Sequence, residues 1–254
     1  MEWRNPGRTG SLIYLLLAFV VGGAATAVTR LRVARRRGLR RVAADLPDGG
    51  VIIIANHTSY ADGVILALAC RRLGRSVRLL ATAGVFRAPV IGALASRLGF
   101  IRVERGSSSA ADALDAAEAA LRAGEAVALF PEGRTTRDPE FWPERSKTGA
   151  VRLALRSTAP IVPVAMVGAH RIVGRRRPVR SLLTSLLLRP EVSIAVGEPI
   201  DVLSLAEQTT PESDDVRRLA DEVMGRLIDL VAELRGEPAP HPTGVESVDD
   251  GTDR

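Results

Sequence analysis

The stretch VIIIANHTSYADGVILALACRRL, residues 51–73, joins an apolar run to a helical pattern through a polar turn. Residues 51–54 are β-branched and follow the turn signal Pro-Asp-Gly-Gly at residues 47–50, so they predict a short buried strand. Residues 64–73 have the spacing of a helix with one apolar face. The polar residues 56–63 are therefore expected on a strand-to-helix turn.

His57 and Asp62 stand in this turn as a His-x-x-x-x-Asp pair, and Thr58 or Ser59 is suited to the helix N-cap. A histidine titrates near neutrality and can accept a proton at working pH. A carboxylate that accepts one ring N–H leaves the other nitrogen free as a base and stabilises the imidazolium. The turn allows His57 to fold back onto Asp62. Alone, the pair also fits a turn-capping histidine and a solvated acid, so the remaining sequence decides between the two.

From residue 51 onward, strand and helix patterns alternate. Apolar runs predict strands at residues 51–54, 76–81, 100–103, 126–130, 161–167 and 192–196. Helical spacing predicts helices at residues 64–73, 88–98, 107–123, 146–156 and 211–234. This order indicates an α/β domain with a mostly parallel sheet flanked by helices. His57, Arg105 and Glu132 each follow a predicted strand, and ligands of such sheets bind beyond the strands' carboxyl ends.

Composition excludes several classes of function. Aromatic residues make up only 4% of the 254 residues, which argues against a single-stranded nucleic-acid surface built on stacking. The only cysteine, Cys70, permits neither an internal disulfide nor a cysteine metal cluster, and we expect no metal. The net charge of +6 is compatible with nucleic acid, anionic lipid or phosphorylated substrates as partners.

The N-terminal region predicts attachment to a membrane. Residues 11–29 carry no charge and are just long enough to span a bilayer, although Ala-Thr-Ala at residues 25–27 also resembles a signal-peptide cleavage site. Seven arginines between residues 30 and 41 favour an uncleaved anchor with the remaining chain on the cytoplasmic side of the cell membrane. Residues 31–44 are expected to lie on an anionic membrane surface as a short amphipathic helix. A nucleic-acid patch is the alternative for this run, but its place beside an apolar segment disfavours nucleic acid.

These patterns divide the chain into three parts. We predict a membrane anchor and basic interfacial segment at residues 1–44, a catalytic domain at 45–235 and a disordered acidic tail at 236–254. Within the domain, the apolar residues 178–190 fit either a core helix or an apolar wall that faces lipid.

Four blocks of sequence carry a resemblance to a known family. NHTSYAD (residues 56–62), LGFIRVERG (98–106), FPEGRTTRD (130–138) and IVPVAMV (161–167) resemble, in order and spacing, the four blocks of the glycerolipid acyltransferase family. Its best-known members are the 1-acylglycerol-3-phosphate acyltransferases. The resemblance implies transfer of an acyl group from acyl-CoA or an acyl carrier protein to the free hydroxyl of 1-acylglycerol-3-phosphate, a membrane lipid, forming phosphatidate. It implies no cofactor beyond this thioester.

The resemblance also assigns roles to individual residues. His57 matches the family's catalytic base and Asp62 the acid that orients it. Arg105 matches a residue assigned to the acceptor phosphate, and Glu132 and Gly133 match a block assigned to acceptor binding. The fourth block, with its proline at position 163, is linked to the acyl donor or to the fold.

The third block departs from the family pattern. The family usually reads Glu-Gly-Thr-Arg-Ser, whereas this chain reads Glu-Gly-Arg-Thr-Thr-Arg at residues 132–137. Arg134 and Arg137 are therefore both candidates for the displaced phosphate contact. Lys147, the only lysine, begins a Lys-x-Gly-Ala run found in related sequences and is a further candidate.

Three other functions stay open. The same chemistry can act on another lysolipid acceptor, which the altered third block favours. A hydrolase with Ser59 as nucleophile lacks the G-x-S-x-G elbow. A non-catalytic membrane-surface protein would not need His57, Asp62, Arg105 and Glu132.

Overall fold

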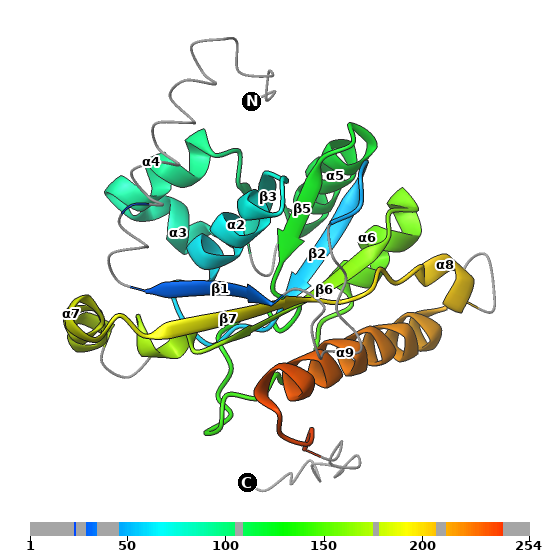
Figure 1. Cartoon of the computed structure of the whole chain (residues 1–254). Helices are drawn as coiled ribbons and strands as arrows, with labels where there is room; N and C mark the ends of the chain where they lie inside the picture. Colours follow the sequence, from blue (N-terminus) through cyan, green and yellow to red (C-terminus); the bar gives the residue numbers. More distant parts are fainter. Residues whose placement is uncertain are drawn as a thin grey trace, which may run out of the picture.

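The structure is a computed structural model that describes residues 23, 29–34, 46–104, 109–174, 178–206 and 212–240. Its centre is a seven-stranded sheet in the order β1-β7-β6-β2-β5-β3-β4 (Figure 1). The strands are β1 (Arg30–Ala34), β2 (Val51–Ala55), β3 (Val77–Thr82), β4 (Ile101–Val103), β5 (Ala126–Leu129), β6 (Ile161–Val167) and β7 (Glu191–Val196).

Helices flank this sheet on both faces. They are α2 (Asp62–Arg72), α3 (Ala83–Arg87), α4 (Pro89–Arg97), α5 (Ser109–Arg122), α6 (Gly149–Ser157), α7 (Pro178–Leu188), α8 (Val202–Leu205) and α9 (Ser213–Arg235), with a 3₁₀ turn η1 (Ala169–Arg171). The short helices α3 and α8 were not predicted. All adjacent strand pairs are parallel except β6 and β7, which run antiparallel. The predicted α/β fold with a mostly parallel, helix-flanked sheet is confirmed.

Strand β2 is the centre of the core. It pairs in parallel with β5 on one side and β6 on the other, and all five of its residues are fully buried. Because successive side chains of a strand point to opposite faces, Ile52 and Ile54 pack with α5, α6 and α9, whereas Val51 and Ile53 pack with α2. Burial on both faces explains why β2 is apolar at every position rather than alternating between apolar and polar residues.

Strand β1 corrects the prediction for the segment before residue 45. Residues 31–34 were predicted to be helical, but they belong to β1, which pairs in parallel with β7. Leu31 contacts the core, whereas Arg30 and Arg32 are exposed, so the alternation of Arg with apolar residues is that of an edge strand. The sheet thus includes residues that lie before position 45, and residues 35–44 lie outside the described residues.

The predicted membrane anchor falls almost wholly outside the described residues. Of residues 1–29, the structure describes only 23 and 29. Within the described part of the chain, no helix combines the length and the apolar character needed to cross a bilayer.

Helix α9 is capped by Gly236, whose φ of 70° is typical of a helix C-cap. Residues 241–254 of the predicted tail lie outside the described residues.

Candidate active site at the carboxyl ends of β2 and β5

Asn56 extends the pairing of β2 with β6 beyond the end of the strand. Its Nδ2 donates to the carbonyl of Met166 at 2.9 Å, and the Met166 N–H donates to Oδ1 at 2.8 Å. The side-chain amide therefore makes the two hydrogen bonds that a backbone peptide would make in the sheet. As a result the main chain is free to leave the sheet at His57.

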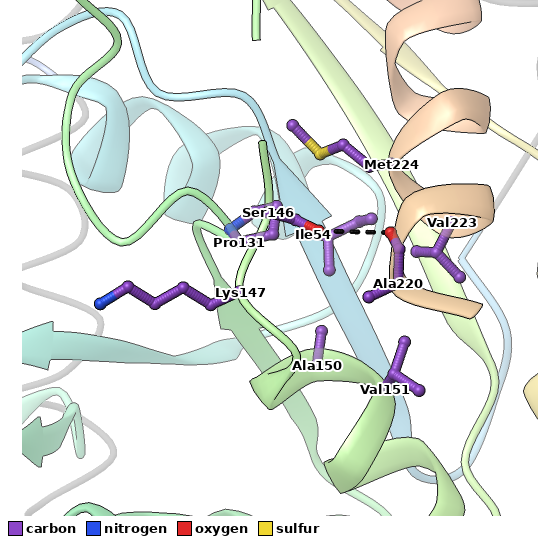
Figure 2. Close-up of a pocket in the computed structure, with 9 residues that line it drawn as sticks. All are labelled: Ile54, Pro131, Ser146, Lys147, Ala150, Val151, Ala220, Val223 and Met224. Atoms are coloured by element: carbon purple, nitrogen blue, oxygen red, sulfur yellow. Dashed lines mark hydrogen bonds between the residues drawn. The ribbon is translucent and has the colours of Figure 1, made fainter. Parts of the chain in front are cut away.

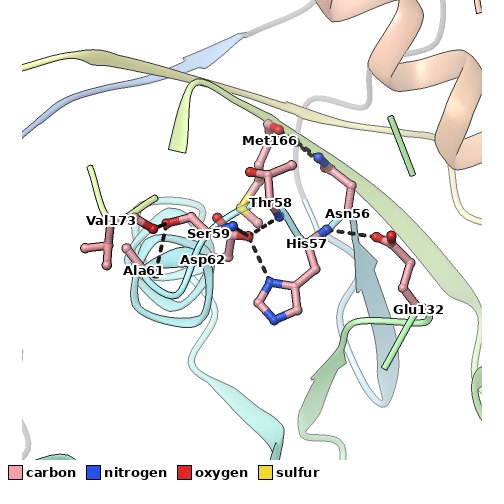
Figure 3. A network of polar contacts seen from close by, with 9 residues as sticks. All are labelled: Asn56, His57, Thr58, Ser59, Ala61, Asp62, Glu132, Met166 and Val173. Atoms are coloured by element: carbon pink, nitrogen blue, oxygen red, sulfur yellow. Dashed lines mark hydrogen bonds and ion pairs between the residues drawn. The ribbon is translucent and has the colours of Figure 1, made fainter. Parts of the chain in front are cut away.

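The His57 ring folds back onto Asp62, as the sequence predicted (Figure 3). Nδ1 lies 2.9 Å from Asp62 Oδ2, and the same oxygen accepts the backbone N–H groups of Thr58 at 2.6 Å and Ser59 at 2.8 Å. The predicted capping by Thr58 or Ser59 is wrong, because the N-cap is Ala61 and makes no side-chain cap bond. The turn is instead stabilised by the acid, which accepts N–H groups from residues before the helix.

Asp62 is fully buried, so its charge depends on these hydrogen bonds. Burial raises the pKa of its carboxyl, and the bonds from His57, Ser59 and Thr58 oppose this shift. Because Nδ1 is hydrogen-bonded to the acid, Nε2 is the ring nitrogen that remains for a substrate. This is the arrangement in which a carboxylate orients an imidazole base.

Phe130, which directly follows β5, supports the imidazole from the side. Its ring stacks on that of His57 with centroids 4.1 Å apart and an interplanar angle of 16°. The His57 side chain is 19% exposed. The ring is therefore packed against the protein and still reachable from solvent.

Glu132 joins the His57 turn to the loop before α6. Its Oε1 accepts the His57 backbone N–H at 3.0 Å, and its Oε2 accepts the Glu144 N–H at 3.0 Å. Burial raises the pKa of Glu132 to about 7, although these two N–H bonds lower it. Both carboxyl oxygens are thus engaged by the chain itself. The predicted contact of Glu132 with an acceptor stays a prediction, and its position within the protein is that of a support for His57.

The three cationic residues predicted to contact the acceptor phosphate near Glu132 lie in the segment between β5 and α6. Arg134 forms two contacts with the Glu144 carboxylate, at 2.8 and 3.2 Å, and the Arg137 backbone N–H donates to the same group at 2.9 Å. Partial burial raises the pKa of Glu144, but these donors outweigh it and the net shift is downward. The Arg137 and Lys147 side chains are exposed, and neither has an ion-pair partner among the described residues.

The Lys147 side chain packs against Gly133, the fourth residue of the third block. Gly133 has a φ of 70°, and a Cβ placed on it would come within 3.0 Å of the Lys147 Cε. The glycine therefore serves both the turn and the close approach of the lysine stem. Its predicted role in acceptor binding stays a prediction.

Arg105 lies outside the described residues, so its predicted contact is not placed. The strand before it, β4, is three positions from β2 in the sheet. Pro163 is buried within β6, where it pairs with Ile54 and its carbonyl accepts the Gly197 N–H at 2.8 Å. Its surroundings are those of a core residue.

Ser59, the nucleophile of the hydrolase alternative, is engaged elsewhere. Its hydroxyl is fully buried, donates to the Val173 carbonyl at 2.9 Å and accepts the Ala61 N–H at 3.1 Å. A serine nucleophile is activated by a hydrogen bond to its base. This hydroxyl is bonded to a main-chain carbonyl instead, which argues against the hydrolase.

Several supporting residues were not predicted as part of the site. Phe130 and Thr136 lie inside the third block, and the Thr136 N–H donates to the His57 carbonyl at 2.7 Å. Asn56 begins the first block. Their roles rest on stacking and on backbone contacts, which leave no characteristic spacing in a sequence.

A small pocket lies between the end of β2, α6 and α9 (Figure 2). Its lining includes Ile54, Ala150, Val223 and Met224 and is mostly apolar. Of the predicted site residues that the structure describes, only Lys147 borders it, and the lysine side chain extends away from it. This pocket is therefore separate from the histidine site.

Comparison with models of known protein families assigns the chain to one of them. The family model described as Acyltransferase matches residues 30–167, which include all four sequence blocks. The chain belongs to the acyltransferase family. The glycerolipid acyltransferase resemblance of the four blocks is thereby confirmed.

Curated relatives in this family carry matching names. The chain is 29% identical over 154 residues to the 1-acyl-sn-glycerol-3-phosphate acyltransferase BAT2 of Brassica napus, covering 60% of this chain and 41% of that protein. It is 28% identical over 180 residues to the enzyme of the same type from Borreliella burgdorferi, covering 70% of this chain and 66% of the relative. The chain thus spans less than half the length of the plant acyltransferase.

A solved structure shares the fold. The crystal structure of the 1-acyl-sn-glycerophosphate acyltransferase PlsC from Thermotoga maritima aligns with a TM-score of 0.61 at 20% identity, covering 94% of this chain and 86% of that one. At this identity the likeness concerns the architecture of the acyltransferase domain.

Proposed function

We propose that this chain is an O-acyltransferase that moves an acyl group from an acyl thioester to the free hydroxyl of 1-acylglycerol-3-phosphate. The observation that carries the proposal is the contact between His57 Nδ1 and the buried carboxylate of Asp62, which leaves Nε2 as the available base. Family membership and the names of the curated relatives support the choice of reaction.

The proposed step needs no group beyond the two substrates. Nε2 of His57 takes the proton of the acceptor hydroxyl while its oxygen attacks the thioester carbonyl. The C–O bond forms, the C–S bond breaks, and the thiolate takes the proton back from Nε2–H. Asp62 holds the ring in the tautomer with hydrogen on Nδ1 and stabilises the imidazolium between these transfers.

Arg137 and Lys147 are the cations that we propose for the acceptor phosphate. Both are exposed and border the loop that contains Glu132, whereas the Arg134 guanidinium is already paired with Glu144. Cationic side chains near a phosphate supply charge-assisted hydrogen bonds. The pairing of Arg134 also favours a second candidate function, the same transfer to a different lysolipid.

The donor and the location follow from the same proposal. The donor is acyl-CoA or an acyl carrier protein, and the acceptor and product are membrane lipids. We therefore place the enzyme at the cell membrane with its catalytic domain on the cytoplasmic side, as the arginines after residue 29 predict.

The test is acceptor-dependent thiol release. Membranes that contain the full chain are supplied with acyl-CoA, or with an acyl carrier protein donor, and with a series of lysophospholipids. Release driven by lysophosphatidate and abolished by His57→Ala is the expected result. Release with a different lysolipid alone would keep the chemistry and replace the acceptor, and no release with either donor would refute the proposal.

A further inference from the structure

Helix α7 presents its apolar side chains to the outside of the domain. Leu187 is 85% exposed and Leu183 59%, whereas the only buried residue of the helix is Ser185 at 1%. Ser181, one turn before Ser185, is half-buried and belongs to the same face. An ordinary surface helix packs its apolar face on the protein. In α7 the orientation is reversed, with the polar face toward the protein and the apolar face outward.

The outward face forms a continuous stripe. Val179, Leu183, Leu186 and Leu187 follow the spacing i, i+4, i+7 and i+8, which places them along one side of a helix. The Ser185 hydroxyl on the protein side is satisfied within the helix, since its Oγ donates to the Leu182 carbonyl at 2.7 Å. A contiguous exposed apolar patch of this kind marks a contact site.

Charge indicates what the stripe contacts. Residues 178–190 contain Arg180 and Arg189 and no acidic residue, and both arginines are exposed. The nearest acid along the chain, Glu191, forms an ion pair with Arg32 on β1 at 3.1 Å. Leucines on one face with cations near both ends are the pattern of a helix that lies in the interface of an anionic leaflet.

The position of α7 in the fold supports the same partner. The Thr29 hydroxyl and the Arg30 N–H both donate to the carbonyl of Pro190, at 2.8 and 3.0 Å, two residues beyond the end of α7. Thr29 is the last residue of the charge-free stretch 11–29. The end of that stretch is therefore joined to the end of α7 at one edge of the sheet, where Figure 1 shows α7 beside β1 and β7.

We propose that α7 is a second membrane contact, which lies in the headgroup region of an anionic leaflet with Leu183, Leu186 and Leu187 inserted. The contact orients the domain, because it lies at the β1 edge while the histidine site lies at the carboxyl ends of β2 and β5. The inference concerns binding and does not depend on the proposed acyl transfer.

The test uses the full chain in vesicles of phosphatidylcholine, with and without phosphatidylglycerol. Leu187→Cys carries an environment-sensitive fluorophore, and Leu203→Cys on α8 is the matched control, since Leu203 is also an exposed leucine. The native Cys70 is buried, and burial raises the pKa of its thiol to about 12, so it does not compete for the label.

We expect the label at Leu187 to emit at shorter wavelength than the control, to be quenched by nitroxide lipids and to have a several-fold smaller quenching constant with aqueous iodide. The difference should be larger with phosphatidylglycerol. Equal iodide access at Leu187 and Leu203 would overturn the proposal. Disulfide pairing between unlabelled Leu187→Cys chains, formed with an added oxidant and persisting as more lipid dilutes the protein, would also overturn it, since this would identify a second copy of the chain as the occupant.

Discussion

Asp62→Asn is the substitution that separates the charge of the acid from its hydrogen bonds. An asparagine oxygen can still accept the N–H groups of Thr58 and Ser59, which lie 2.6 and 2.8 Å from Oδ2, so the turn should persist. The amide cannot stabilise an imidazolium by charge. Any loss of rate therefore reports on the electrostatic role of the carboxylate.

The expected loss can be worked from the geometry. Nδ1 and Oδ2 are 2.9 Å apart, which puts the centres of the two charges roughly 4 Å apart. At an effective dielectric constant near 20, unit charges at that separation interact by about 4 kcal/mol, which corresponds to a ~10³-fold loss in kcat. This lies within the ~10²–10⁴-fold range expected for general base catalysis.

The assay is initial-rate thiol release at saturating donor and acceptor, with His57→Ala measured in parallel. Thermal unfolding of both variants controls for loss of the fold. If Asp62→Asn retained more than about a tenth of the wild-type kcat while His57→Ala abolished activity, the imidazole would work without the acid and the reasoning would be refuted.

Three further substitutions test two residues at the site, Ser59 and Glu132, and the backbone turn at Gly168, which follows β6. Ser59→Ala should cost about 1–3 kcal/mol of unfolding free energy through its lost hydrogen bonds yet keep substantial thiol release; a loss equal to that of His57→Ala would favour a serine nucleophile. Burial raises the pKa of Glu132 from 4.5 to about 7, so the folded state retains a proton that the unfolded state has released. As the pH rises from 4.5 to about 7, urea unfolding should show the unfolding free energy of the wild type falling by about 3 kcal/mol relative to that of Glu132→Gln. A relative rise over this pH range would contradict the raised pKa. Gly168→Ala should lower the free energy of unfolding by about 3 kcal/mol, because φ there is 98° and the new Cβ would lie 2.4 Å from the Glu191 carbonyl oxygen; a cost below about 1 kcal/mol would contradict this reasoning.

The centre of the sheet could be predicted because burial on both faces imposes a pattern. Strand β2 is apolar at every position, and the polar turn after it fixes where His57 stands, so the fold-back onto Asp62 could be expected from sequence. The edge strand β1 was missed since its arginines suggested a membrane-surface helix, although their alternation with Leu31 and Val33 is that of a half-exposed strand.

The supports of the site could not be predicted, because they are contacts to the main chain. No spacing shows that Glu132 accepts the N–H of His57 or that Phe130 stacks on its ring. The antiparallel direction of β7 was likewise hidden, since a buried strand reads the same in either orientation. For α7 the sequence left a core helix and a lipid-facing wall open, and the exposure of Leu187 excludes the core helix.

The hydrogen bonds that hold the His57 backbone affect how freely the surrounding loop can vary between related chains. The His57 N–H donates to the Glu132 side chain, and the His57 carbonyl accepts the main-chain N–H of Thr136. The turn is closed by the main-chain N–H groups of two further residues, which donate to the Asp62 carboxylate. Main-chain groups are present whatever the side chain, so most loop positions can mutate without displacing the imidazole. Under the proposed function, substitutions in this loop can therefore change its side-chain chemistry, and with it the proposed acceptor preference, while the His57 imidazole keeps its position.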